Sequence, residues 1–205
     1  IRLADKWWSF IPHRIKHAPA KTGAAVLLLL LGLMGYGTWN ALHPVFRYYE
    51  INLDKNAGEM QELNAIMVSD LHLGAIVDSR RLVDLVDRIN ECNPDIIFLV
   101  GDVIDGNVTP FVEQDMAATL SGLRPRLGTY MVLGNHDGMR QNIVPYVQAA
   151  GIKVLIDQYQ LINGSFYLVG RSNRGHGLGS SLDQAPLDSV LATLDKSRPI
   201  ILLDH

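Results

Sequence analysis

The sequence predicts an α/β domain preceded by a helix long enough to cross a membrane. Residues 23–42 form a run of 20 residues without a charged side chain, about the length that spans roughly 30 Å of hydrocarbon. Further along, short apolar runs alternate with stretches in which apolar residues recur at helical spacing, a pattern typical of buried parallel strands joined by helices. Four of these runs, residues 65–68, 96–100, 130–133 and 200–203, are closely followed by polar side chains.

Length and charge indicate one globular domain plus a separate basic segment. The chain has 205 residues, 48% of them hydrophobic, which is enough for such a domain. Residues 1–50 carry six Lys or Arg against two Asp or Glu, a net charge of +4, whereas the remainder carries 12 against 19, a net charge of −7. A negatively charged domain lacks the cations that neutralise nucleic-acid phosphates, so we expect no nucleic-acid partner. The single cysteine, Cys92, excludes an internal disulfide.

The amino-terminal part is predicted to lie at and across a membrane. Residues 1–22 are basic and aromatic, typical of an interfacial segment; a disordered tail is the alternative. Residues 23–42 are predicted to be a transmembrane helix. A cleaved signal peptide is the alternative, because the most apolar part, residues 24–34, is short enough for its core. Five Lys or Arg precede the helix, so the positive-inside rule places its amino end in the cytoplasm and the following domain outside.

The rest of the chain divides into a connector and one domain. Residues 43–63 are the predicted connector, with a first strand expected at residues 46–53, and residues 64–205 are the predicted α/β domain. Asp78 or Ser79 is expected to cap a helix that ends before Pro94. Further helices are predicted at residues 111–123, 141–150 and 187–194, and short strands at residues 152–156, 159–162 and 166–169, with Asn163-Gly164 as a hairpin turn.

Acidic, imidazole and amide side chains follow the four apolar runs. Asp70 and His72 follow the first run, Asp102 and Asp105 the second, Asn135, His136 and Asp137 the third, and Asp204 and His205 the fourth. In an open α/β sheet the carboxyl ends of neighbouring strands border one crevice. We therefore expect these side chains to converge there. Mixed carboxylate, imidazole and amide ligands suit Mn, Fe or Zn better than a calcium cage of oxygens alone.

The ordered motifs resemble those of a known family. Asp70-x-His72, Gly101-Asp102-x-x-Asp105 and Gly134-Asn135-His136-Asp137, in this order, are similar to the motifs of the calcineurin-like metallophosphoesterase superfamily. Within it the chain most resembles the membrane-associated branch, homologues of UDP-diacylglucosamine hydrolase. The match spans roughly residues 65–205. It implies a layered α/β sandwich that is incomplete at its carboxyl end and preceded by the transmembrane helix.

The resemblance also implies a mechanism with two divalent metal ions, Mn, Fe or Zn. Asp102 would bridge the ions, Asp70 and His72 would hold the first, and Asn135 and His205 the second. His136 would stabilise the phosphoryl group and help protonate the leaving alkoxide, with Asp105 orienting its ring. The implied substrate is a phosphomonoester, a phosphodiester or a lipid-linked pyrophosphate. A catalytically silent, membrane-tethered binding or scaffold protein of the same fold is the alternative.

Two departures from the family pattern qualify this interpretation. The family completes both ion shells with a later Gly-His-x-His pair, and none follows His205, so we expect a missing carboxyl-terminal part to supply these ligands. Arg171 and Arg174 stand where similar proteins often carry acidic residues. They are predicted either to bind a substrate phosphate, as arginine does with two parallel hydrogen bonds, or to belong to an ordinary loop.

Overall fold

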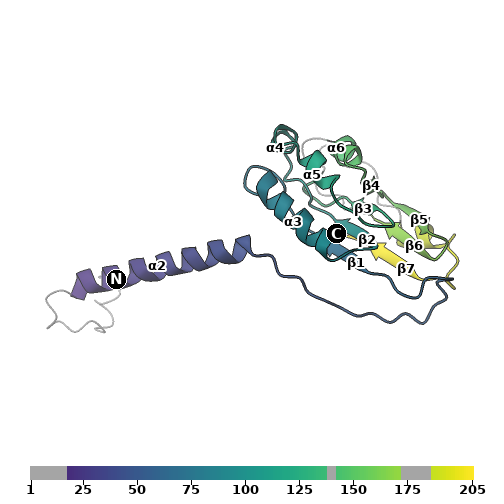
Figure 1. Ribbon diagram of the computed structural model, residues 1–205, viewed down its shortest axis with the longest axis horizontal. Helices are drawn as coiled ribbons and strands as arrows, with labels where there is room; N and C mark the ends of the chain where they lie inside the picture. Colours follow the sequence, from purple (N-terminus) through teal and green to yellow (C-terminus); the bar gives the residue numbers. More distant parts are fainter. Residues whose placement is uncertain (1–17, 138–141, 172–185) are drawn as a thin grey trace. The chain divides into compact units, whose positions relative to one another are not determined.

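A computed structural model describes residues 18–137, 142–171 and 186–205 (Figure 1). The chain divides into two compact units, Ile1–Glu50 and Ile51–His205. The division falls inside the predicted connector. The two units are described separately below.

The first unit contains the helix α2, Ala18–Leu42. It begins five residues before the predicted start. Residues 20–42 form the one helix in the described part of the chain that is long and apolar enough to cross a membrane, and none of its most apolar window is buried against protein. At about 1.5 Å per residue these 23 residues exceed roughly 30 Å of hydrocarbon. Its length and composition suit both a membrane anchor and a signal sequence.

The second unit is built on a parallel sheet. β1 (Ala65–Val68), β2 (Ile96–Val100), β3 (Thr129–Val132) and β4 (Lys153–Val154) lie in that order, and each pairs in parallel with the next. Three of the four apolar runs are therefore adjacent strands that end at one edge. This arrangement confirms the predicted convergence of their carboxyl ends.

A second sheet contains the fourth apolar run. β5 (Gln158–Ile162) and β6 (Phe166–Gly170) are antiparallel, and β7 (Ile200–Leu203) pairs in parallel with β6. Asn163 and Gly164, at the turn between β5 and β6, have φ values of 47° and 68°. Asn and Gly tolerate this left-handed conformation better than other residues, as the hairpin prediction required.

The main core lies between the two sheets. Alternate residues of β2 (Ile96, Phe98 and Val100) pack in one cluster with residues of all three strands of the second sheet, including Ile162, Leu168 and Leu203. Because neighbouring strand residues point to opposite faces, Ile97 and Leu99 face the other side of the first sheet. The helices α3 (Ser79–Glu91), α4 (Thr109–Glu113), α5 (Met116–Leu120) and α6 (Val144–Ala149) gather along the first sheet (Figure 1). The predicted layered α/β architecture is confirmed.

Two predicted elements are wrong. The helix predicted at residues 111–123 is two short helices, α4 and α5, because Asp115 between them has a φ of 50°, which no α-helix accommodates. The strand predicted at residues 46–53 is not formed, and Tyr48, Tyr49 and Ile51 are exposed. A strand needs a partner to pair its backbone groups, and no described strand pairs with this segment.

Several other predicted elements are shorter than expected. The helix expected at residues 187–194 is α7, Leu187–Leu191, and α6 covers part of the helix expected at residues 141–150, whose first residue lies outside the described part of the chain. The strand expected at residues 152–156 is reduced to β4. Each predicted stretch contains a helix or strand of the expected type. The prediction is too long because the apolar pattern continues past the ends of the element that forms.

Asp78 caps α3, as predicted. Its Oδ1 accepts a hydrogen bond from the backbone N–H of Arg81 (3.2 Å), and its Oδ2 accepts from Nη2 of Arg80 (2.9 Å). The bond from Arg80, together with the bond from Arg81, holds the pKa of the Asp78 carboxyl below its ordinary value of 3.8. The charged form therefore stabilises the folded state above that value, and this contribution is lost as pH falls through the folded-state pKa.

Replacing Asp78 with alanine is expected to lower the Tm by a few degrees at neutral pH, because the helix loses its cap. The Tm difference between parent and variant should shrink as pH falls below 3.8. Thermal unfolding followed by circular dichroism measures both. Asp84→Ala, at an exposed position of the same helix, is the control, and an equal Tm loss in that variant would contradict the capping role.

Candidate metal centre

The turns after β1 and β2 continue to pair beyond the sheet. The backbone N–H of Asp70 donates to the carbonyl of Gly101 (3.1 Å), and that of His72 donates to the carbonyl of Asp102 (2.9 Å). Asp70, His72 and Asp102 have φ values of 56°, 46° and 52°, the left-handed conformation that non-glycine residues rarely adopt. The predicted ligands thus stand on a tightly turned and hydrogen-bonded backbone.

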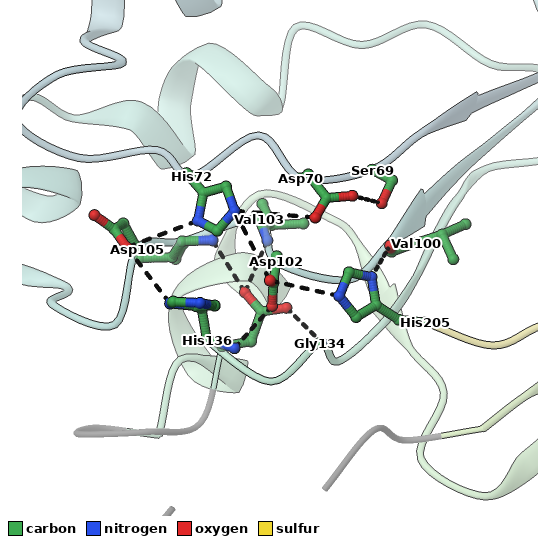
Figure 2. A network of polar contacts seen from close by, with 12 residues as sticks. Ser69, Asp70, His72, Val100, Asp102, Val103, Asp105, Gly134, His136 and His205 are labelled. Carbon is green, nitrogen blue, oxygen red and sulfur yellow. Dashed lines mark hydrogen bonds and ion pairs between the residues drawn. The ribbon is translucent and has the colours of Figure 1, made fainter. Parts of the chain in front are cut away.

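Asp102 lies at the centre of the cluster (Figure 2). Its Oδ2 is 3.8 Å from Nε2 of His72 and 3.4 Å from Nε2 of His205. Its Oδ1 accepts a hydrogen bond from the backbone N–H of His136 (2.7 Å). The residue is 3% exposed. One buried carboxylate therefore has histidine side chains from two other strand ends within reach of a shared cation.

Asp105 lies between two other ring nitrogens. Its Oδ1 is 3.7 Å from Nδ1 of His72 and 3.6 Å from Nδ1 of His136. The two imidazole rings meet edge to face with centroids 4.9 Å apart. Asp105 is thus close enough to both rings to influence their orientation and tautomer.

The tautomer of His205 follows from one hydrogen bond. Its Nδ1 lies 2.8 Å from the carbonyl oxygen of Val100, and a carbonyl can only accept, so Nδ1 carries the proton. In the neutral ring the lone pair is then on Nε2, which is the nitrogen directed at Asp102. A backbone carbonyl that fixes a histidine in this way is a recurrent feature of metal-ligating imidazoles.

Asp70 lies on the exposed side of the cluster, and Asn135 is placed near it by its neighbours in the chain. Asp70 is exposed, its Oδ1 lies 4.0 Å from Nε2 of His72, and its Oδ2 accepts a hydrogen bond from the hydroxyl of Ser69. Asn135 is half-buried and lies between Gly134 and His136, whose backbone N–H groups are both bound by carboxylates of the cluster. The structure places every predicted site residue at this one edge of the fold.

The cluster has the donor types of a transition-metal site. Two groups, Asp70 with His72 and Asp102, and Asp105 with His72 and His136, each have candidate ligand atoms within 4.8 Å of one another. Carboxylate oxygens and imidazole nitrogens suit Mn, Fe and Zn. Several carboxylates this close together repel one another, and a bound cation relieves that repulsion. The residues present therefore fit divalent metal ions.

Asp137 has a role that the sequence indicated only by its place in a motif. It is 1% exposed, and its two oxygens accept three backbone N–H groups, those of Val103 (2.9 Å), Ile104 (3.0 Å) and Gly134 (2.9 Å). Burial raises the pKa of the Asp137 carboxyl and the charge of Asp102 raises it too, while the hydrogen bonds from the backbone oppose this shift. Bonds from backbone amides leave no pattern in side-chain types, so sequence alone could not reveal them.

Two glycines of the motifs are required by close packing. A Cβ on Gly101, whose φ is 74°, would lie 2.3 Å from Cγ of His205, and a Cβ on Gly134 would lie 2.2 Å from Oδ1 of Asp102. Both distances are shorter than real contacts allow. Any other residue at either position would displace a predicted ligand.

Replacing Gly134 with alanine is expected to weaken metal binding by about 10–100-fold, as changes next to metal ligands do, and to lower the free energy of unfolding by about 1–3 kcal/mol through overpacking. Calorimetric titration with Mn²⁺ and chemical unfolding measure the two effects. Gly74→Ala is the matched control, because its Cβ would meet Asp105 at 3.7 Å, an ordinary contact. Equal metal affinity in both variants would contradict the close-packing role.

Arg171 is engaged by a carboxylate of the same chain. Its Nη1 lies 2.7 Å from Oδ2 of Asp204, the residue before His205, and its backbone N–H donates to the carbonyl of Leu203 (2.9 Å). The predicted alternative partner, a substrate phosphate, would have to compete with this ion pair. Arg174 lies outside the described residues.

Comparison with known proteins agrees with the motifs. The Calcineurin-like phosphoesterase family model matches residues 63–205. The chain belongs to this family. The match covers the metal centre and both sheets, so the predicted family is confirmed.

Several proteins similar to this chain are named as metallophosphoesterases. A Danio rerio protein named "Transmembrane protein with metallophosphoesterase domain" is 36% identical over 112 residues, 54% of this chain and 25% of the relative. An "Uncharacterized metallophosphoesterase" of Aquifex aeolicus is 34% identical over 149 residues, 70% of this chain and 55% of the relative. Another of that name, from Helicobacter pylori, is 26% identical over 200 residues, 96% of this chain and 52% of the relative. The chain thus spans between a quarter and about half of the length of these relatives.

Proposed function

We propose that this calcineurin-like phosphoesterase hydrolyses phosphomonoesters or phosphodiesters at a centre of two divalent metal ions. The observation that carries the proposal is the position of Asp102, a buried carboxylate with Nε2 of His72 at 3.8 Å and Nε2 of His205 at 3.4 Å. When bound, the two ions would supply a nucleophile from water at neutral pH and neutralise charge on the transferring phosphoryl group.

In this proposal the site residues divide into two sets. Asp70 and His72 would hold one ion, Asn135 and His205 would hold the other, and Asp102 would contribute to both. The carbonyl of Val100 keeps the proton of His205 on Nδ1, so that the lone pair of the neutral ring is on Nε2, the nitrogen that would ligate. A mixed donor set of this kind accepts Mn, Fe or Zn.

His136 and Asp105 are proposed to act on the substrate side. Oδ1 of Asp105, 3.6 Å from Nδ1 of His136, would orient the ring of that histidine. That ring can stabilise the phosphoryl oxygens and donate its proton to the leaving alkoxide, the role of a general acid. His136 is 39% exposed at its side chain, so a substrate can reach it.

A membrane-anchored enzyme with its metal centre outside the cytoplasm is the finer proposal. Support comes from the apolar helix at residues 20–42, from the basic residues before it and from the relatives named as transmembrane proteins. A lipid-linked pyrophosphate would be a fitting substrate near a bilayer. Comparing hydrolysis of such a lipid with that of a soluble pyrophosphate in the same micelles tests this substrate class, and equal rates would count against it.

The general function is tested with the full protein, including any native sequence that follows residue 205. Aryl phosphodiesters and aryl phosphomonoesters are expected to be hydrolysed with added Mn²⁺, to be stable after treatment with a chelator, and to be hydrolysed again when Mn²⁺, Fe²⁺ or Zn²⁺ is returned. A protein that binds these ions but hydrolyses no ester above the buffer rate would instead be the silent binding or scaffold protein considered above.

A further inference from the structure

Two loops carry most of the proposed metal and catalytic residues. One follows β2 and contains Asp102 and Asp105; the other follows β3 and contains Asn135 and His136. The strand pairing between them ends at Val100 and Val132, with one further backbone hydrogen bond from the N–H of Gly101 to the carbonyl of Val132 (3.1 Å). Beyond this point the hydrogen bonds and ion pairs that join the described parts of the two loops run through carboxylates.

The joining contacts are reciprocal. Asp102, on the first loop, accepts the N–H of His136 on the second (2.7 Å). Asp137, on the second loop, accepts the N–H groups of Val103 (2.9 Å) and Ile104 (3.0 Å) on the first. Its other oxygen accepts the N–H of Gly134 in its own loop (2.9 Å). The two aspartates therefore form a clasp in which each loop holds the backbone of the other.

We propose that Asp137 is a positioning residue that fixes the spacing between Asp102 and the Asn135–His136 pair, and thereby sets the metal affinity and the turnover rate. This inference rests on the proposed function. Asp137 itself is not proposed as a metal ligand, because both of its oxygens accept hydrogen bonds from backbone amides. It acts through the residues that the clasp holds.

A carboxylate is required at this position, not merely a polar residue. One oxygen accepts two N–H groups and the other accepts one, so both oxygens must be acceptors. An asparagine has only one acceptor oxygen, and its NH₂ group would face a backbone N–H. The site is 1% exposed, so water would not satisfy the stranded donor, and one of the loops would have to shift. Displacement of a reacting group by about 1 Å can reduce turnover by about 100-fold.

Asp95 provides a matched control. It lies at the amino end of β2, whereas the loop that contains Asp102 leaves the carboxyl end of that strand. Oδ2 of Asp95 accepts the backbone N–H of Asn64 (2.9 Å), and its Oδ1 accepts Nε of Arg126 (3.0 Å). Asp95 therefore joins neighbouring segments of the domain as Asp137 does, but at the edge away from the metal centre.

The test compares Asp137→Asn and Asp95→Asn in the full protein. For Asp137→Asn we expect kcat with Mn²⁺ and the affinity for Mn²⁺ each to fall by about 10–100-fold, the usual effect of removing a group that orients metal ligands, with the KM for an aryl phosphodiester within about twofold of the parent. Asp95→Asn should lower the Tm while leaving kcat and Mn²⁺ affinity within about twofold. Parent-like kcat and Mn²⁺ affinity in Asp137→Asn, or equal losses in both variants, would overturn the proposal.

Hydrogen–deuterium exchange of the unsubstituted protein is the second measurement, and it does not depend on a variant that folds. The amides of Val103, Ile104 and Gly134 are expected to exchange as slowly as those of β2, although they lie in loops. Fast exchange at these three amides would refute the clasp. A parent that shows slow exchange but neither binds Mn²⁺ nor hydrolyses esters would refute the proposed function while leaving the clasp itself supported.

Discussion

Replacing Asp102 with asparagine is expected to abolish metal-dependent ester hydrolysis, so that the ester is hydrolysed no faster than in buffer without protein or metal. The asparagine can keep the hydrogen bond from the backbone N–H of His136, which lies 2.7 Å from Oδ1. It loses the negative charge, however, and puts a non-ligating NH₂ group where Oδ2 meets His72 and His205. If Asp102 contributes to both ions, as proposed, its loss would disturb the binding of both.

Hydrolysis of an aryl phosphodiester and the number of ions bound per chain are the two measurements for this variant. Circular dichroism establishes that Asp102→Asn is folded under the assay conditions. Asp84→Asn, the same substitution at an exposed position of α3, should match the parent in both measurements. If Asp102→Asn turns over at more than about a tenth of the parental rate with its metal content unchanged, Asp102 does not bridge the ions.

His136→Ala is expected to lower kcat by about 10²–10⁴-fold, the usual contribution of general acid catalysis, while the protein keeps its bound metal. The side chain is proposed to face the substrate without ligating either ion, so removing it leaves the ligand set intact. Its backbone N–H, which holds Asp102, is unchanged by the substitution.

The metal content of His136→Ala separates two roles for this histidine. His136 also belongs to a group with His72 and Asp105 whose candidate ligand atoms lie within 4.8 Å of one another. Retention of parental Mn²⁺ affinity with a low kcat supports the acid role. Joint loss of an ion and of activity would show that His136 is a ligand, and the proposed division between metal residues and catalytic residues would be wrong.

The strand ends could be predicted because apolar composition and topology determine them together. A run such as residues 96–100, buried along its whole length, cannot lie at a surface, and parallel pairing brings the next residues to one edge. The positions of Asp102 and His136 followed from this rule. Asp70 follows β1, an edge strand in which Met67 is 69% exposed, so parallel pairing without full burial positions it. The helix α3 could be predicted because its apolar residues recur at helical spacing, and three of them, Leu82, Val86 and Ile89, are buried.

Features that depend on the backbone could not be predicted in this way. The break at Asp115 arises from a single left-handed residue inside an apolar pattern that was otherwise consistent with one helix. The strand expected at residues 46–53 had a suitable pattern, but a pattern does not provide a pairing partner. The bond from His205 to Val100 and the clasp through Asp137 both use main-chain groups, which are identical at every position of a sequence.

The left-handed backbone at Asp70, His72 and Asp102 has a consequence for how this protein fails under stress. The left-handed conformation costs most non-glycine residues about 1–2 kcal/mol, although aspartate and histidine adopt it more readily than most. Tertiary contacts must therefore hold these three residues in the left-handed conformation. Damage that loosens the sheet edge, even at a distance, would therefore displace these three candidate ligands before the rest of the fold is lost, and an inactive protein that still gives a folded spectrum would be the earliest sign of decline.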